Sequence, residues 1–291
     1  MKFLIALING LSAGGTYAII ALGYTMVYGI AKMLNFAHGD VIMAGGYMMF
    51  VTLTLLGHPL WAVAAAVVFC VVLGIVIERF AYRPLRGASP LAVLITAIGV
   101  SSLLQSLAQI LFGSATKMPV KLQISGAFKI GSFDIAYSTL ITLAVTVVVM
   151  AVLTLFVNYS KTGRAMIAVS EDRDAALLMG INTNAIITIT FAIGSALAAI
   201  AGYLMLCKAP SLSTTLGAMP GIKAFTAAVI GGIGSIPGAM VGGILLGVIE
   251  SLSYSVPALA PYTDAVEFAI LIIVLLVKPS GILGKMRREK V

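Results

Sequence analysis

The segment LNFAHGD at residues 34–40 places an amide, an imidazole and a carboxylate together between two long apolar runs. One interpretation is a cytoplasmic turn in which Asn35 or Asp40 caps the following helix. The other is a helix broken inside the protein, whose free N–H groups favour an anion such as a substrate carboxylate on a transport path. His38 is a poor metal-ligand candidate because no second ligand is spaced to help it. Asn35, His38 and Asp40 are therefore candidate residues of a translocation path.

Tyrosines form a second polar pattern within the first apolar run. Tyr17, Tyr24 and Tyr28 are spaced by seven and four residues, which puts their side chains on one face of a helix. A buried stripe with satisfied hydroxyl groups would explain this spacing. The lining of a polar path would explain it as well, so Tyr17 and Tyr24 join the candidates for the translocation path.

Residues 161–182 form the longest charged stretch between apolar runs, and they contain Lys161, Arg164, Glu171, Asp172, Arg173 and Asp174. Ala, Leu and Met dominate at 174–179 and favour a helix, while Gly180 and Asn182 favour its end. The pattern predicts a short amphipathic helix that is rimmed with charge and closed by glycine. A plain loop would be unusually ordered for this composition, so we interpret the segment as a docking site for a partner protein on the cytoplasmic face.

Four further charged residues lie near the ends of apolar runs. Asp264 and Glu267 are three residues apart, so a helix places them on one face near the outer mouth. They could attract a substrate ammonium or a binding protein, or they could form a solvated rim. Lys223 and Glu250 could form an ion pair within the membrane, where ionisable groups are presumed functional, or both could lie at the interface.

The composition requires that much of this chain face lipid. Of the 291 residues, 60% are apolar and only 10% are charged, and the mean hydropathy is +1.11. A water-soluble chain is nearer a quarter charged, and no water-soluble fold of this size hides so much apolar surface. The net charge of +8 does not indicate a nucleic-acid partner, because basic residues gather at the ends of apolar runs. Cys70 and Cys207 lie within such runs and indicate neither a disulfide framework nor a zinc site.

Long unbroken apolar runs indicate helices rather than the alternating segments of a β-barrel. We expect a single all-α membrane domain over residues 1–291, a polytopic bundle of about eight spans. Residues 220–236 are apolar but interrupted by glycine, and they could form a broken or re-entrant helix. Glycine pairs spaced by four residues, as at Gly10 and Gly14, predict close helix contacts. The expected spans are 4–30, 41–56, 60–78, 91–112, 137–157, 185–207, 237–253 and 265–277.

Lys and Arg placement orients the spans, because cytoplasmic loops carry an excess of basic residues. Basic residues gather at 79–86, at 161–173 and at 285–290, and we expect all three segments in the cytoplasm. The loop at 113–136 also carries three lysines, so the bias is uneven. Counting spans places the N-terminus outside and the turn at 231–238 in the cytoplasm, provided that 220–236 crosses as a short element.

Four short motifs carry a resemblance to a known family. The sequence DAALLMGI at 174–181 resembles the EAA-x-x-x-G signature of ABC importer permeases, with aspartate in the first position. TGRA at 162–165, LNFAHG at 34–39 and GGIGSIPGA at 231–239 are similar to the branched-chain amino acid ABC transporter permeases of LivH type. The resemblance covers essentially the whole chain, and its motifs occur in the expected order.

The resemblance implies a permease subunit of the bacterial inner membrane that carries branched-chain or other hydrophobic amino acids by alternating access. It implies cytoplasmic ABC ATPase subunits, a second permease subunit in a heterodimer, and an extracytoplasmic substrate-binding protein as partners. In that family the glycine-bounded helix inserts into a cleft of the ATPase. This assigns ATPase coupling to segment 161–182, and in particular to Arg164, Asp174, Ala175, Ala176 and Gly180.

The glycine-rich run at 231–238 lacks the Gly-Lys-Ser/Thr ending of a phosphate-binding loop, so the motor must be another polypeptide. We expect no cofactor, no metal and no enzymatic activity in this chain. An alternative is a secondary carrier or channel for small amino acids or amides, which should need ionisable residues deep in its spans. An intramembrane enzyme is a further alternative, but the chain has only His38 and His58 and few buried acids to build a catalytic set.

Overall fold

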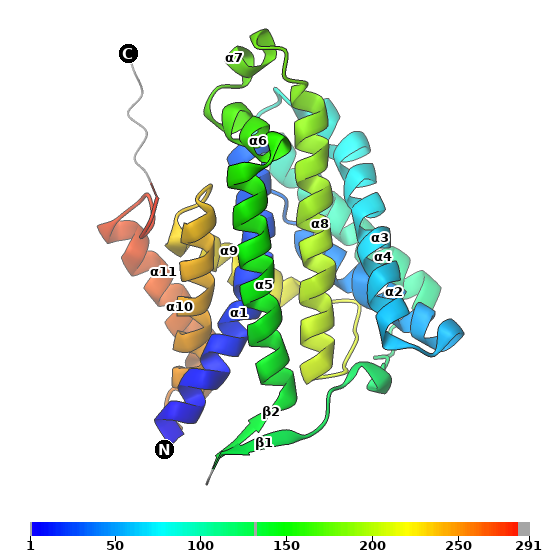
Figure 1. Ribbon diagram of the computed structural model, residues 1–291, viewed down its shortest axis with the longest axis vertical. Coiled ribbons are helices and arrows are strands. Elements are labelled where there is room, and N and C mark those ends of the chain that lie inside the picture. Colours follow the sequence, from blue (N-terminus) through cyan, green and yellow to red (C-terminus); the bar gives the residue numbers. More distant parts are fainter. Residues whose placement is uncertain (1, 131–132, 285–291) are drawn as a thin grey trace.

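Long helices build the structure, a computed structural model that describes residues 2–130 and 133–284 (Figure 1). Eight helical segments within these residues are long and apolar enough to cross a membrane. The predicted all-α polytopic bundle is thus confirmed. The long helices are α1 (Lys2–Ala31), α2 (His38–Leu56), α3 (Pro59–Ile77), α4 (Pro90–Phe112), α5 (Tyr137–Tyr159), α8 (Thr183–Lys208), α10 (Ile236–Ser255) and α11 (Thr263–Val277).

Shorter elements join the spans. A π-helical turn, η1 (Glu78–Tyr82), and a 3-10 turn, η2 (Arg83–Leu85), extend α3 toward the loop before α4. The loop after α4 contains η3 (Val120–Leu122) and a hairpin of β1 (Ala127–Ile130) and β2 (Phe133–Ala136), which the sequence analysis does not predict. The turn η4 (Ala260–Tyr262) precedes α11. Proline at the first turns of α3, α4 and α10 suits these helix starts, where an N–H has no helical partner.

Helix α9 (Ala218–Gly231) is the broken element that the glycine pattern indicates. Its 14 residues rise only about 21 Å, less than the hydrocarbon thickness of about 30 Å. Gly217, just before α9, lies against the backbone of Gly39 in the first turn of α2. Gly234, just after α9, lies beside Gly29 near the end of α1. The element therefore starts inside the bundle and ends at one of its faces.

Two opposite ends of the bundle can be distinguished in Figure 1. Helices α6 (Lys161–Glu171) and α7 (Arg173–Leu178) lie at one end, while the chain's N-terminus and the β1–β2 hairpin lie at the other. Arg86 contacts Asn184 at the start of α8, directly after segment 161–182, so the segments at 79–86 and 161–182 both lie at the first end. These two basic segments thus lie on the same side, as predicted, whereas the assignment of this end to the cytoplasm stays a prediction. The basic tail at 285–290 lies outside the described residues.

Small residues bring α1 and α10 into backbone contact. A Cβ added at Gly14 would lie 2.7 Å from Ile244 Cα, and one added at Gly10 would lie 2.8 Å from Val248 Cα. Helices in lipid associate through this kind of close packing rather than through burial of apolar area. By contrast, α4 and α11 expose large apolar side chains such as Ile110 and Leu276, as lipid-facing helices should.

Candidate functional site

Segment 161–182 contains the predicted short helix, α7 (Arg173–Leu178), and a further helix, α6 (Lys161–Glu171), that the sequence does not predict. The Ser160 hydroxyl oxygen accepts a hydrogen bond from Gly163 N–H at 2.8 Å and caps α6. The chain then bends at Asp172, whose Oδ1 accepts hydrogen bonds from Asp174 N–H at 3.0 Å and Ala175 N–H at 2.9 Å. This carboxylate caps α7, where a negative charge is favoured by the helix dipole.

Gly180 ends α7 as predicted. Its φ of +82° lies in the left-handed region, which glycine adopts without a steric cost. Ile181 N–H donates to the Ala176 carbonyl and Gly180 N–H donates to the Leu177 carbonyl, both at 3.0 Å. These two bonds form a Schellman motif and satisfy carbonyls that the helix end would otherwise leave unpaired.

The outer surface of α7 is more apolar than its charged surroundings suggest. Leu177, Leu178 and Met179 are 59%, 88% and 82% exposed. Arg164, Asp174, Ala175 and Gly180, which the resemblance assigns to coupling, are also exposed, whereas Ala176 is buried. Sequence reasoning treated Leu177, Leu178 and Met179 only as helix formers and missed them as candidate contacts. The signal was an apolar triplet within the most charged segment of the chain.

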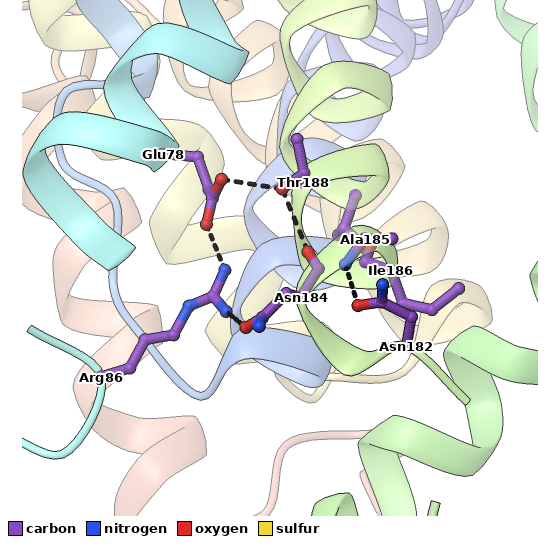
Figure 2. A network of polar contacts seen from close by, with 8 residues as sticks. Glu78, Arg86, Asn182, Asn184, Ala185, Ile186 and Thr188 are labelled. Carbon is purple, nitrogen blue, oxygen red and sulfur yellow. Dashed lines mark hydrogen bonds and ion pairs between the residues drawn. The ribbon is translucent and has the colours of Figure 1, made fainter. Parts of the chain in front are cut away.

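A polar network joins this end of the bundle to two spans (Figure 2). Arg86, in the connection between α3 and α4, forms an ion pair with Glu78 of η1 and donates to the Asn184 side-chain oxygen at the start of α8. The Thr188 hydroxyl donates to the second Glu78 oxygen at 2.8 Å. Asn182 caps α8 by accepting from Ala185 N–H at 3.1 Å. The sequence indicates Arg86 only as one of the basic residues that orient the spans, and this network is not predictable from it.

Charges on α7 act on the same network. Burial has the largest effect on the pKa of the Arg86 guanidinium and lowers it, and the positive charge of Arg173 lowers it further. The Glu78 carboxylate opposes both effects. An arginine stays protonated under these influences, so the Arg86 guanidinium keeps its positive charge. A displacement of α7 therefore changes the electrostatic environment of a buried ion pair.

Asn35, His38 and Asp40 lie together in the core, and all three are buried. The Tyr82 hydroxyl donates to Asn35 Oδ1 at 2.9 Å, and the Gln105 amide donates to Asp40 Oδ1 at 2.9 Å. The segment thus links α2 to η1 and α4. Neither Asn35 nor Asp40 caps α2 through its side chain, because α2 starts at His38 after Ala37.

Tyr24 and His38 form the centre of this polar core. Their rings meet edge to face with centroids 4.8 Å apart, and His38 Nε2 has no hydrogen-bond partner among the described residues. Tyr24 also packs against Phe225 of α9. The candidate path residues Asn35, His38, Asp40 and Tyr24 therefore meet where α1, α2 and α9 converge.

Tyr17 lies elsewhere, beside a cluster of charged groups. Its hydroxyl donates to Glu250 Oε1 at 3.1 Å. The same oxygen pairs with Lys223 Nζ at 2.6 Å, so the expected pair of Lys223 and Glu250 is confirmed. Asp264 and Glu267 also contact Lys223, and this places them on one face as predicted.

Known proteins match this chain almost from end to end. The family model described as "Branched-chain amino acid transport system / permease component" matches residues 6–275. The chain belongs to this permease family. The permease BraD of Pseudomonas aeruginosa, named for high-affinity branched-chain amino acid transport, is 47% identical over 99% of this chain and 98% of its own length. The LivH permeases of Escherichia coli and Salmonella typhimurium are each 46% identical over 100% of this chain and 98% of theirs.

Family membership confirms the resemblance and the transport role drawn from it. The permease is a multi-pass subunit of the inner membrane in an ABC importer rather than an enzyme or a gradient-driven carrier. ATPase and substrate-binding partners follow from the family in general. The expectation of few ionisable groups deep in the spans was nevertheless incomplete, because Lys223 and Glu267 are buried inside the bundle.

Loss of Arg86 should destabilise the permease, because it leaves the buried Glu78 carboxylate without its cationic partner. Breaking a buried ion pair from one side costs about 3–5 kcal/mol. We expect Arg86→Met to lower the melting temperature of the detergent-purified protein in scanning fluorimetry. The double variant Arg86→Met/Glu78→Gln removes the unpaired charge and should recover most of the loss. Equal melting temperatures for the single and double variants would contradict this role of the pair.

Proposed function

We propose that this permease carries branched-chain or other hydrophobic amino acids as one half of a heterodimer with a second, different permease. Separate ATPase subunits bind segment 161–182 on the cytoplasmic side and drive alternating access. A substrate-binding protein delivers the amino acid at the opposite face. The names of the relatives BraD and LivH support the substrate class.

The exposed triplet Leu177, Leu178 and Met179 on α7 carries the coupling proposal. Exposing apolar side chains to water at the end of a membrane bundle costs free energy unless a partner covers them. The capping by Asp172 and the Schellman motif at Gly180 hold α7 in one orientation without that partner. Such a preformed helix binds with a smaller loss of conformational entropy than a flexible loop.

Motion of α7 has a direct route into the spans. Asn182 caps α8 two residues after Gly180, and Asn184 holds Arg86 in the α3–α4 connection. A displacement of α7 therefore pulls on α8 and, through Arg86 and Glu78, on the end of α3. Packed helices respond to such displacements as rigid elements that shift between discrete arrangements.

The proposed translocation path passes two clusters of polar residues in the bundle interior. Asn35, His38, Asp40 and Tyr24 are buried where the broken helix α9 meets α2. Separation of these helices would expose their polar atoms, and broken helices at that depth are how transporters present backbone N–H groups to a carboxylate. Tyr17 lies beside the charged cluster around Lys223, which marks a second region of the path.

Two substitutions at Gly180 test the coupling role. Because φ is +82° there and no described atom lies within 4 Å of an added Cβ, a side chain meets strain but no clash. Gly180→Val should distort the end of α7 at a cost of about 1–2 kcal/mol and reduce ATPase copurification several-fold. Gly180→Asn should behave nearly as wild type, since asparagine tolerates this conformation.

Gly57 provides the matched control, because it also ends a helix, α2, in the left-handed conformation with a φ of +69°. Within the described part of the chain, only the Lys121 ammonium group, 3.8 Å away, lies within 4 Å of a Cβ added there. Gly57→Val should leave ATPase binding unchanged. Pull-down of the ATPase with a tagged permease, followed by ATP-dependent amino-acid uptake in proteoliposomes, measures both effects. Unimpaired assembly and uptake by Gly180→Val would refute the coupling role.

A further inference from the structure

Three carboxylates surround a single ammonium group inside the bundle. Lys223 Nζ of α9 lies 2.6 Å from Glu250 Oε1 of α10 and 2.8 Å from Asp264 Oδ1 of α11. It also lies 3.3 Å from Glu267 Oε1 of α11. Lys223 and Glu267 are buried, Glu250 is largely buried, and half of the Asp264 side chain is exposed. We refer to Lys223, Glu250, Asp264 and Glu267 as the charge cluster.

The charge cluster holds more negative charge than ion pairing with Lys223 requires. One carboxylate would neutralise the ammonium group, and each additional buried carboxylate carries a desolvation penalty of several kcal/mol. Glu267 Oε2 is buried and has no hydrogen-bond partner among the described residues. Glu267 thus contacts Lys223 through Oε1 and keeps a second buried oxygen without a partner, and ionisable groups buried within a membrane bundle mark functional sites.

A cavity adjoins the charge cluster at Tyr17. Its volume is about 220 Å³, and it is lined by Ala13, Thr16, Tyr17, Met205, Lys208 and Pro220. The Tyr17 hydroxyl donates to Glu250 Oε1, so this side chain belongs to the cavity wall and to the charge cluster at once. Lys208 supplies a positive group to the same cavity and interacts electrostatically with Glu250. The cavity thus has a cationic group in its wall and a surplus of carboxylates next to it.

We propose that the cavity and the charge cluster together bind one zwitterionic amino acid with a small apolar side chain. The ammonium group of the ligand faces Glu250 and Glu267 beside Tyr17, its carboxylate faces Lys208, and its side chain contacts Ala13, Met205 and Pro220. This inference rests on the proposed function, since it locates the substrate in the path of the permease.

Size and charge together favour this ligand class over a bare cation. Pockets for drug-sized ligands measure about 300–1,000 Å³, so 220 Å³ suits a smaller solute. A monovalent metal cation would satisfy the carboxylates but leave Lys208 and the apolar walls without a function. An amino acid uses all three, and its two charged groups match the opposite charges of the site.

The test measures binding of L-leucine to the complete transporter in nanodiscs, without the substrate-binding protein, by saturation-transfer difference NMR. Leucinamide lacks the carboxylate and 4-methylpentanoate lacks the ammonium group, so each should bind the wild type more weakly than leucine. Glu267→Gln and Lys208→Gln should each weaken leucine binding about tenfold, as expected for loss of a charge-assisted hydrogen bond. Lys208→Gln should bind leucine and leucinamide with equal affinity. Glu267→Gln should bind leucine and 4-methylpentanoate with equal affinity.

Asp134→Asn and Lys129→Gln are matched controls, because both side chains are exposed on the hairpin at the end of the bundle opposite α7. They should leave leucine binding unchanged. The inference is overturned if wild type gives no saturable leucine signal, if the variants bind all three compounds as wild type does, or if Na⁺ or K⁺ displaces leucine. ATP-dependent uptake with normal ATPase copurification in the Lys208 and Glu267 variants would then leave the proposed function standing.

Discussion

The double variant Leu178→Asp/Met179→Asp is expected to abolish both copurification of the ATPase subunits and ATP-dependent uptake. Leu178 ends α7 and Met179 follows it, and their side chains are 88% and 82% exposed, so neither substitution removes a buried side chain from the permease. Burying a leucine or methionine side chain at an interface is worth about 1.5–3 kcal/mol. An aspartate at the same place must also lose its hydration, so each single variant should weaken ATPase binding more than tenfold.

Thermal stability separates this effect from misfolding. The purified variants should melt at the same temperature as wild type, since exposed side chains contribute little to the folded state. Val120→Asp is the matched control, because Val120 is 59% exposed in the loop at the opposite end of the bundle. Full ATPase binding by the double variant would show that α7 is not the docking element, and equal loss in Val120→Asp would show that the effect is nonspecific.

Gly14→Leu is expected to prevent accumulation of folded permease. An added Cβ at Gly14 lies 2.7 Å from both Ile244 Cα and Ile244 O, and 2.9 Å from Gly243 O. These are backbone atoms of α10, so relief requires the two helices to separate by the width of a side chain. Separation removes the packing on which helix association in lipid depends, and overpacking alone costs about 1–3 kcal/mol.

Gly99 of α4 allows a matched comparison in the same fold. No described atom lies within 4 Å of a Cβ added there, and leucine favours a helix more than glycine does. Gly99→Leu should therefore accumulate and elute as wild type does in fluorescence-detected size-exclusion chromatography, while Gly14→Leu should aggregate or be degraded. A monodisperse peak at wild-type yield for Gly14→Leu would contradict the contact between α1 and α10.

Much of the fold follows from local sequence. Hydrocarbon requires backbone hydrogen bonds to be satisfied within each span, so long apolar runs specify helices without reference to their neighbours. The same locality applies to the end of α7, because Gly180 adopts its left-handed conformation through bonds to residues within one turn. The break at 220–236 was also visible, since glycine weakens a helix wherever the helix packs.

Contacts between distant residues were decided by tertiary structure. Arg86 and Asn184 are 98 positions apart, and Tyr17 and Glu250 are 233 apart; no local pattern specifies which helix faces will meet. The sequence did indicate a pair of Lys223 and Glu250, but the convergence of two further carboxylates on Lys223 depends on how α11 packs against α9 and α10. The exposure of Leu177, Leu178 and Met179 likewise depends on how α7 lies at the end of the bundle (Figure 1). Sequence thus determined the helices and the helix end at Gly180, whereas packing between helices determined which charged residues form ion pairs and which apolar side chains stay exposed.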